Sequence, residues 1–170
     1  MLRRGFVIFV CAVLISILSS YGVPWLLQAS WQNFMSVPLL AALIALLLSS
    51  PRRALLWVFG LGIGMDLARM PAPPYHLMAL AAAWMVVQFT RDPRIAMPLW
   101  LRRGVSVSAA SAAYFAILLA AAFLRVAWWP SAGEWRIVCF SIIGHAIAAL
   151  LCAGAVRAAL GRTRAFAPGS

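Results

Sequence analysis

Few side chains in this sequence are suited to acid–base chemistry, and they are far apart along the chain. The acids are Asp66, Asp92 and Glu134, and the histidines are His76 and His145. Hydrolysis inside a membrane by carboxylates needs two acids on facing helices. Only Asp66 lies within an apolar run, so these residues do not predict a catalytic site.

Metal binding and nucleophilic catalysis are not indicated either. Neither histidine has a second ligand at i+3 or i+4, so each is interpreted as a hydrogen-bonded helix residue. The cysteines show no CxxC spacing and fall in apolar runs, at Cys11, Cys139 and Cys152. No base stands near the serines that give residues 104–123 a surface suited to helix packing, which are Ser106, Ser108 and Ser111. We therefore expect no enzymatic activity, no metal and no cofactor.

The most informative stretch is residues 59–67, Phe-Gly-Leu-Gly-Ile-Gly-Met-Asp-Leu. Gly60 and Gly64 are one helical turn apart, so they lie on one face and let another helix approach closely. Gly62 thins the neighbouring face. The pattern predicts a tight helix contact, either within this chain or with a partner protein.

Asp66 makes this stretch more specific. A carboxylate within a membrane span costs roughly 2.5–3.5 kcal/mol at the bilayer centre and less near an interface, so it usually has a partner. The nearest candidate is Arg69. We predict that Asp66 pairs with Arg69 or bonds to the backbone of the proline-rich turn at residues 71–74; direct contact with another subunit is the alternative.

The elements that position these residues follow from the composition. Hydrophobic residues make up 65% of the 170 residues and charged residues 10%, too few to cover a water-soluble domain. The formal net charge of +11 does not indicate a nucleic-acid-binding protein, because the basic residues stand between apolar runs and form no continuous face. Lipid is therefore the expected solvent, and nucleic acid is not an expected partner.

Six apolar runs are long enough to cross a bilayer, which takes about 20 residues or fewer where the flanking residues snorkel. Ser50 as N-cap and Pro51 as first residue predict the start of the third helix. The first run resembles a signal peptide but lacks a convincing cleavage site, so an uncleaved helix is expected. The predicted transmembrane domain covers residues 1–160, with helices at about 6–21, 34–50, 51–67, 75–89, 104–123 and 137–160 and a polar cytoplasmic tail at 161–170.

The arginines predict the orientation, because positive charge stays on the cytoplasmic side. Only three of the fourteen fall on one side of the predicted spans, at Arg69, Arg125 and Arg136. Both termini are therefore predicted to be cytoplasmic. A re-entrant hairpin of the third and fourth helices would give the same count. Tryptophans in or beside the outer connectors predict an aromatic belt, at Trp25, Trp31, Trp128, Trp129 and Trp135.

The pattern from residue 47 to residue 90 resembles the MreD family of bacterial rod-shape-determining membrane proteins. The resemblance rests on Leu-Leu-Ser-Ser at 47–50, Pro-Arg-Arg at 51–53, Phe-Gly at 59–60, Gly-Met-Asp-Leu at 64–67, a short turn, and His-Leu-Met-Ala-Leu at 76–80. Length, six spans and cytoplasmic ends agree with that family across nearly the whole chain.

The resemblance implies an all-α, six-helix membrane bundle similar to the substrate-binding subunits of energy-coupling-factor transporters. It implies a non-enzymatic scaffold in the bacterial cytoplasmic membrane, which binds an MreC-like protein and works with MreB, RodA and a transpeptidase in peptidoglycan synthesis. Gly60, Gly62, Gly64, Asp66 and Arg69 would then serve helix packing or partner binding. The alternative is a small-molecule-binding subunit of an energy-coupling-factor type transporter.

Overall fold

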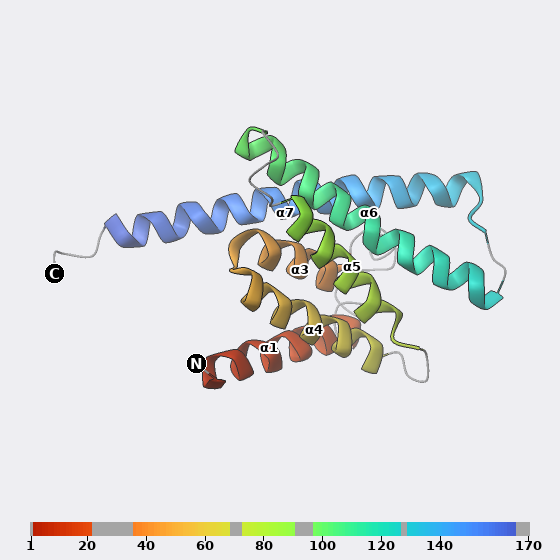
Figure 1. Cartoon of the computed structure of the whole chain (residues 1–170), viewed down its shortest axis with the longest axis horizontal. Helices are drawn as coiled ribbons and strands as arrows, with labels where there is room; N and C mark the ends of the chain where they lie inside the picture. The colour runs from red at the N-terminus through yellow and green to blue at the C-terminus, as the bar shows by residue number, and fades with distance from the viewer. Residues whose placement is uncertain (1, 22–35, 69–72, 91–96, 127–128, 166–170) are drawn as a thin grey trace.

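The computed structural model describes residues 2–21, 36–68, 73–90, 97–126 and 129–165. These residues form helices and no strands (Figure 1), which confirms the predicted all-α class. In chain order the helices are α1 (Leu2–Tyr21), α3 (Val37–Leu48), α4 (Pro51–Leu67), α5 (Tyr75–Thr90), α6 (Leu99–Val126) and α7 (Ala132–Ala165). Several residues singled out from the sequence lie outside the described part: Trp25, Trp31, Arg69, Asp92 and Trp128.

Two of these helices are long and apolar enough to cross a membrane. Their qualifying segments are Leu99–Arg125 in α6 and Ala132–Ala159 in α7. Shorter apolar segments occur in α1, α3 and α5, at Gly5–Ser19, Val37–Leu48 and Tyr75–Thr90. The chain is thus weakly compatible with a membrane protein by length and composition.

The helix starts follow local sequence signals. α4 begins at Pro51 after Ser50, as predicted, although the Ser50 side chain makes no capping hydrogen bond. Ser36 does cap α3, because its side chain accepts a hydrogen bond from the Leu39 amide at 3.4 Å and Pro38 occupies the first turn.

Several predicted helix ends differ from the observed ones. α6 begins at Leu99 instead of residue 104, so the predicted start of the fifth helix is five residues late. α7 runs from Ala132 to Ala165 instead of from 137 to 160, so the predicted tail is helical at first. An apolar run marks the part of a helix suited to lipid, whereas arginine and alanine continue the helical backbone beyond that run.

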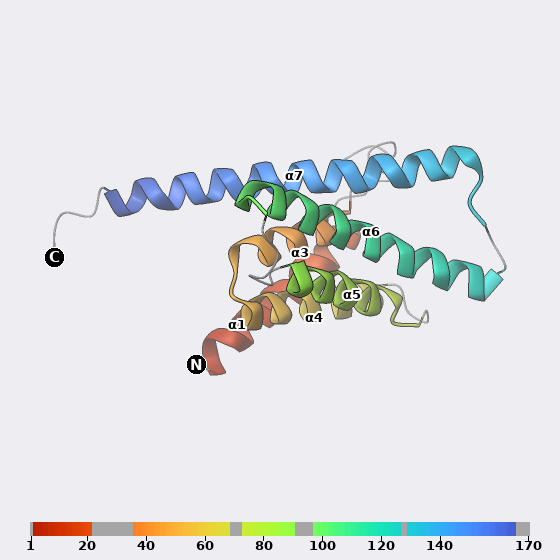
Figure 2. The same ribbon diagram turned by 45° about the horizontal axis from the view of Figure 1, so that its top comes forward.

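The helices are arranged around α3, which contacts α1, α4, α5, α6 and α7. Figure 2 shows α6 and α7 on one side of α3, with α1, α4 and α5 on the other. Leu39, Leu43 and Leu46 of α3 are fully buried or nearly so, and they pack with Val58 of α4 and Leu80 of α5. The interior is therefore an aliphatic core around the shortest helix.

The helices run between two ends of the bundle. In Figure 1 the start of α1, the start of α4, the start of α6 and the end of α7 lie on the left, and the end of α4 and the start of α7 lie on the right. α1 and α4 are parallel, as are α3 and α7. α7 extends beyond the other helices on the left; at 34 residues it is about 51 Å long.

Candidate functional site

The glycines of α4 form a close contact with α1 inside the chain. A Cβ atom added to Gly60 would lie 2.6 Å from the Ala12 Cβ, and one added to Gly64 would lie 2.7 Å from the Ser16 Cβ. Side chains have no room there, so the two backbones approach directly. The buried Ser16 hydroxyl also donates a hydrogen bond to the Leu61 carbonyl at 2.9 Å. The sequence predicted that this face contacts a helix either of this chain or of a partner protein. The structure shows the contact within the chain.

Gly62 serves the opposite side of α4. A Cβ atom added there would lie 2.7 Å from the Leu77 Cα of α5. The alternating glycines therefore let α4 pack tightly between α1 and α5. These three glycines are buried, so none of them offers a surface to a partner protein.

Asp66 joins the end of α4 to the start of α5. Its carboxylate accepts hydrogen bonds from the backbone amides of His76 at 3.1 Å and Leu77 at 2.9 Å. The His76 Nδ1 lies 3.0 Å from the same carboxylate. A negative charge at the start of a helix also interacts favourably with the helix dipole. Asp66 is thus a side-chain cap for α5 supplied from the neighbouring helix.

The partners of Asp66 in the described chain are not the ones predicted. The carboxylate does bond to backbone, but to the first turn of α5 after the proline-rich turn. Its side-chain partner in the described chain is His76. Arg69, the partner predicted from the sequence, lies outside the described residues.

His145 fixes the start of α3 from the middle of α7. Its Nε2 accepts a hydrogen bond from the Ser36 amide at 2.8 Å, so that nitrogen carries no proton. The proton is on Nδ1, which donates to the Ser141 carbonyl at 2.7 Å. His145 is fully buried, and these two bonds hold it as one neutral tautomer. Its interpretation as a hydrogen-bonded helix residue is confirmed.

Arg157 fixes the other end of α3. Its guanidinium donates a hydrogen bond to the Leu47 carbonyl at 2.8 Å, where the last turn of a helix leaves carbonyls without a partner. α7 therefore binds α3 at both ends, with Ser36 beside His145 and Leu47 beside Arg157. The sequence did not predict the contact between Arg157 and Leu47, because these residues are 110 positions apart.

The polar side chains of α6 have a similar structural use. Ser106 and Ser111 are buried, and the Ser106 hydroxyl lies 2.6 Å from the Thr90 hydroxyl of α5. Ser108 is exposed. The predicted packing surface on this helix is therefore correct for two of the three serines.

The polar contacts described above join one helix to another. Within the described ranges, no group of three or more His, Cys, Asp or Glu residues could hold a metal ion. The free cysteines are exposed and stand apart on α1 and α7, at Cys11, Cys139 and Cys152. The aromatic ring beside His76 is that of Tyr114, with ring centroids 6.5 Å apart. The contacts of Asp66 join α4 to α5, and those of His145 and Arg157 join α7 to α3.

No protein-family model, no curated protein and no solved structure matches this chain. The resemblance to the MreD family therefore rests on the residues that carry it in this sequence.

Proposed function

We propose that this chain crosses a bacterial cytoplasmic membrane six times, with both termini in the cytoplasm. The helix directions support this topology. The first and third spans must run the same way, and α1 and α4 are parallel, since Ala12 lies against Gly60 and Ser16 against Gly64. The second and sixth spans must also agree, and α3 and α7 are parallel.

The charges at the two ends of the bundle support the same topology. Arginines in described helices gather at one end, at Arg52, Arg53, Arg102, Arg103 and Arg157. The opposite end has Arg125 and Arg136. This asymmetry matches the excess of positive charge on the cytoplasmic side of membrane proteins.

An aromatic cluster at the end with fewer arginines is a further support. The Trp129 ring lies 5.8 Å from the Trp135 ring and 6.1 Å from the Phe123 ring, between centroids. Trp129 is 67% exposed. Tryptophan prefers the interface of a bilayer, so this cluster fits the outer edge of the membrane.

Within that membrane, the proposed role is a non-enzymatic scaffold of the MreD kind. It binds an MreC-like protein and belongs to the cell-elongation machinery that includes MreB, RodA and a transpeptidase. The observation that carries the proposal is the α4–α5 hairpin, because the residues that resemble the family form one closely packed unit there. Gly60, Gly62, Gly64 and Asp66 are all engaged within the chain.

Partner binding then falls to surfaces that the chain leaves uncovered. α7 has one such apolar surface, with Phe140, Ile143, Ile147 and Leu151 all more than half exposed. These residues repeat at three- and four-residue intervals, so they lie along one side of the helix.

Purification in mild detergent, followed by identification of what accompanies the tagged protein, tests this role. Recovery of an MreC-like protein is expected. Recovery of an ATPase pair or a bound vitamin would contradict it and favour the transporter subunit. A matched pair of variants locates the interface: Ile147→Ala should weaken recovery, whereas Val37→Ala, at a 38% exposed position of α3, should not.

Gly64→Leu provides a second control. It should reduce recovery only through loss of folded protein, since Gly64 packs on α1. Well-folded Gly64→Leu protein that has lost its partner would contradict the internal role of this glycine.

A further inference from the structure

Arg103 of α6 and Arg157 of α7 are a pair of like charges at one end of the bundle. Phe115 and His145 lie side by side in these two antiparallel helices, with ring centroids 6.0 Å apart. The twelve residues from Phe115 back to Arg103 match the twelve from His145 forward to Arg157, so the two arginines are at one level. Both side chains are half-buried, and their guanidinium groups repel each other.

Within the described ranges, no acid neutralises this pair. The described acids are Asp66 and Glu134, which lie at the opposite end of the bundle, at the end of α4 and the start of α7 (Figure 1). The Arg103 side chain makes no hydrogen bond and no ion pair with the described chain. Arg157 donates one hydrogen bond, to the Leu47 carbonyl, and a guanidinium has five N–H donors. Both arginines can therefore donate to an anion from outside the chain.

The surface beside the two arginines is open and partly apolar. A Cβ atom added at Gly104 or at Gly154 would have nothing within 4 Å, so a ligand can approach the helix backbone next to each arginine. Trp100 is one turn from Arg103 and 74% exposed, and Val156 is 39% exposed. Positive charge thus adjoins exposed apolar side chains, which suits a ligand with an anionic head and a hydrocarbon chain.

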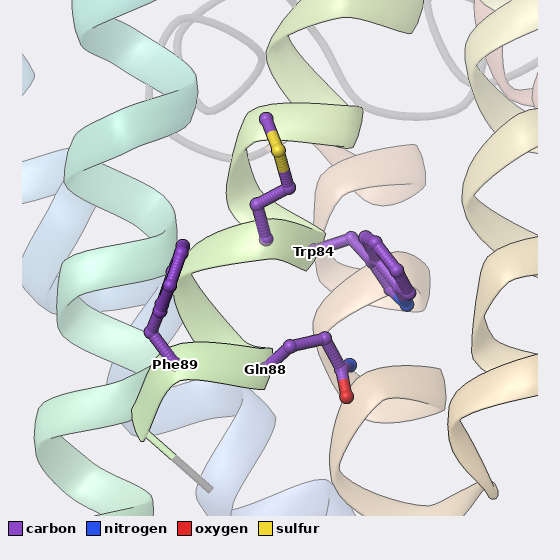
Figure 3. A pocket seen from close by; sticks show the side chains of 4 residues that line it. Trp84, Gln88 and Phe89 are labelled. Atoms are coloured by element: carbon purple, nitrogen blue, oxygen red, sulfur yellow. The ribbon is translucent and has the colours of Figure 1, made fainter. Parts of the chain in front are cut away.

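The pocket on α5 does not offer such a site. Its described lining is Trp84, Met85, Gln88 and Phe89, without a cationic group (Figure 3). Figure 3 also shows Phe89 leaving the helix on the side away from Trp84 and Gln88. The groups suited to an anion are therefore those of α6 and α7.

We infer that Arg103 and Arg157 together bind the phosphate of an anionic phospholipid from the cytoplasmic leaflet. The phosphate oxygens accept hydrogen bonds from both guanidinium groups and offset the repulsion between them. The acyl chains lie against exposed apolar side chains farther along the two helices, such as Val105 and Leu151. Basic groups between membrane helices on the cytoplasmic side are suited to lipid headgroups.

Lipid is chosen over soluble phosphate because exposed apolar side chains adjoin the two charges. The inference rests on the six-span topology proposed above, which sets this end of the bundle at the inner leaflet.

Native mass spectrometry of the purified protein tests the site. The probes are dioleoyl phosphatidylglycerol and, as the match without net charge, dioleoyl phosphatidylcholine. The wild type should bind phosphatidylglycerol more tightly. Arg103→Gln should weaken that binding about tenfold, the effect of one charge-assisted hydrogen bond. Arg125→Gln makes the same change at an exposed position near the other end of α6 and should leave the binding unchanged.

A melting experiment separates loss of a ligand contact from loss of structure. In neutral detergent without anionic lipid, Arg103→Gln should melt no lower than the wild type, because the change removes a repulsion and no described bond. Arg103→Glu should melt higher, since the new carboxylate can pair with Arg157. With phosphatidylglycerol, the wild type should gain more stability than either variant.

Equal binding of the two lipids by the wild type would overturn the inference, as would wild-type affinity in Arg103→Gln. An equal loss of binding in Arg103→Gln and Arg125→Gln would also overturn it, because net charge alone would then explain the preference. A lower melting temperature of Arg103→Gln without lipid would assign Arg103 a structural role instead. Displacement of the lipid by inorganic phosphate at equal concentration would make soluble phosphate the ligand.

Failure of the topology looks different. Release of the wild type from membranes by alkaline carbonate would overturn both the topology and the lipid site. A protein that stays in the membrane but shows no lipid preference would overturn only the site.

Discussion

The close contact between α1 and α4 predicts that one substitution will have opposite effects at two glycines. Gly64 faces α1, where an added Cβ would lie 2.7 Å from the Ser16 Cβ and 2.9 Å from the Val13 carbonyl oxygen. Gly144 of α7 has nothing within 4 Å of the same added atom. Gly64→Ala should therefore destabilise the fold, and Gly144→Ala should stabilise it.

The size of the effect follows from the contact distances. Ordinary contacts of a Cβ atom begin at 3.4 Å, so α1 must move away from Gly64 by a large part of an ångström. Ser16 Cβ and Val13 O are fixed to the backbone and cannot rotate aside. Overpacking of this kind costs about 1–3 kcal/mol, and alanine recovers about 1 kcal/mol through its helix propensity. The net loss at Gly64 should therefore be up to about 2 kcal/mol.

At Gly144 only the propensity remains, and the expected gain is about 0.5–1 kcal/mol. The helix-propensity gain is common to both variants, so they should differ by the overpacking cost, about 1–3 kcal/mol. Reversible unfolding in mixed micelles, with increasing SDS and helicity read by circular dichroism, measures the free energy of unfolding of each. If Gly64→Ala unfolds at the same SDS fraction as Gly144→Ala or a higher one, the tight contact between α1 and α4 is wrong.

Three further predictions concern the polar contacts and the topology. Asp66→Ala should lower the free energy of unfolding by about 1–2 kcal/mol, since two amides at the start of α5 lose their acceptor; Asp66→Asn should cost less, and equal stability of wild type and alanine variant would contradict the cap. His145→Phe should speed hydrogen exchange at the Ser36 amide, measured by mass spectrometry of peptides from α3, because it removes that amide's acceptor; unchanged exchange would contradict the contact. In a cysteine-free background, Ser131→Cys should react with an impermeant maleimide from outside, and Ser50→Cys only after permeabilisation; both positions are exposed, and reaction of both from one side would contradict the six-span topology.

The sequence was most informative where local chemistry determines structure. Pro51 was correctly predicted to start a helix, because its fixed φ angle and missing amide hydrogen suit a first turn. Gly60 and Gly64 were correctly predicted to make a tight contact, since their spacing gives one bare helix face. Neither prediction requires knowing what lies on the other side of the contact.

The partners themselves could not be predicted. Gly64 packs on Ser16, and His145 bonds to Ser36, across long separations in the chain. A one-dimensional pattern predicts that a buried histidine has partners, because burial without hydrogen bonds is costly. The pattern does not predict how α3 packs against α7, and this packing brings Ser36 to His145.

The helix ends were missed for a different reason. The predicted limits followed hydrophobicity, which reports where lipid can surround a helix. Arg102 and Arg103 lie inside α6, and Arg157 lies inside α7. Arginine has a good helix propensity and a long side chain that can reach a bilayer interface, so the backbone remains helical where the apolar run has ended.

The exposed side of α7 supports a location in lipid more strongly than its length does. Phe140 is 66% exposed, Ile147 54% and Leu151 69%. Full burial of one such side chain contributes about 1.5–3 kcal/mol, so in water these three together would leave several kcal/mol unrealised. Soluble monomers rarely expose a continuous apolar surface of this kind. His145 and Arg157 on the same helix bond to α3 within the bundle, so these two polar groups do not interrupt the apolar surface formed by Phe140, Ile147 and Leu151.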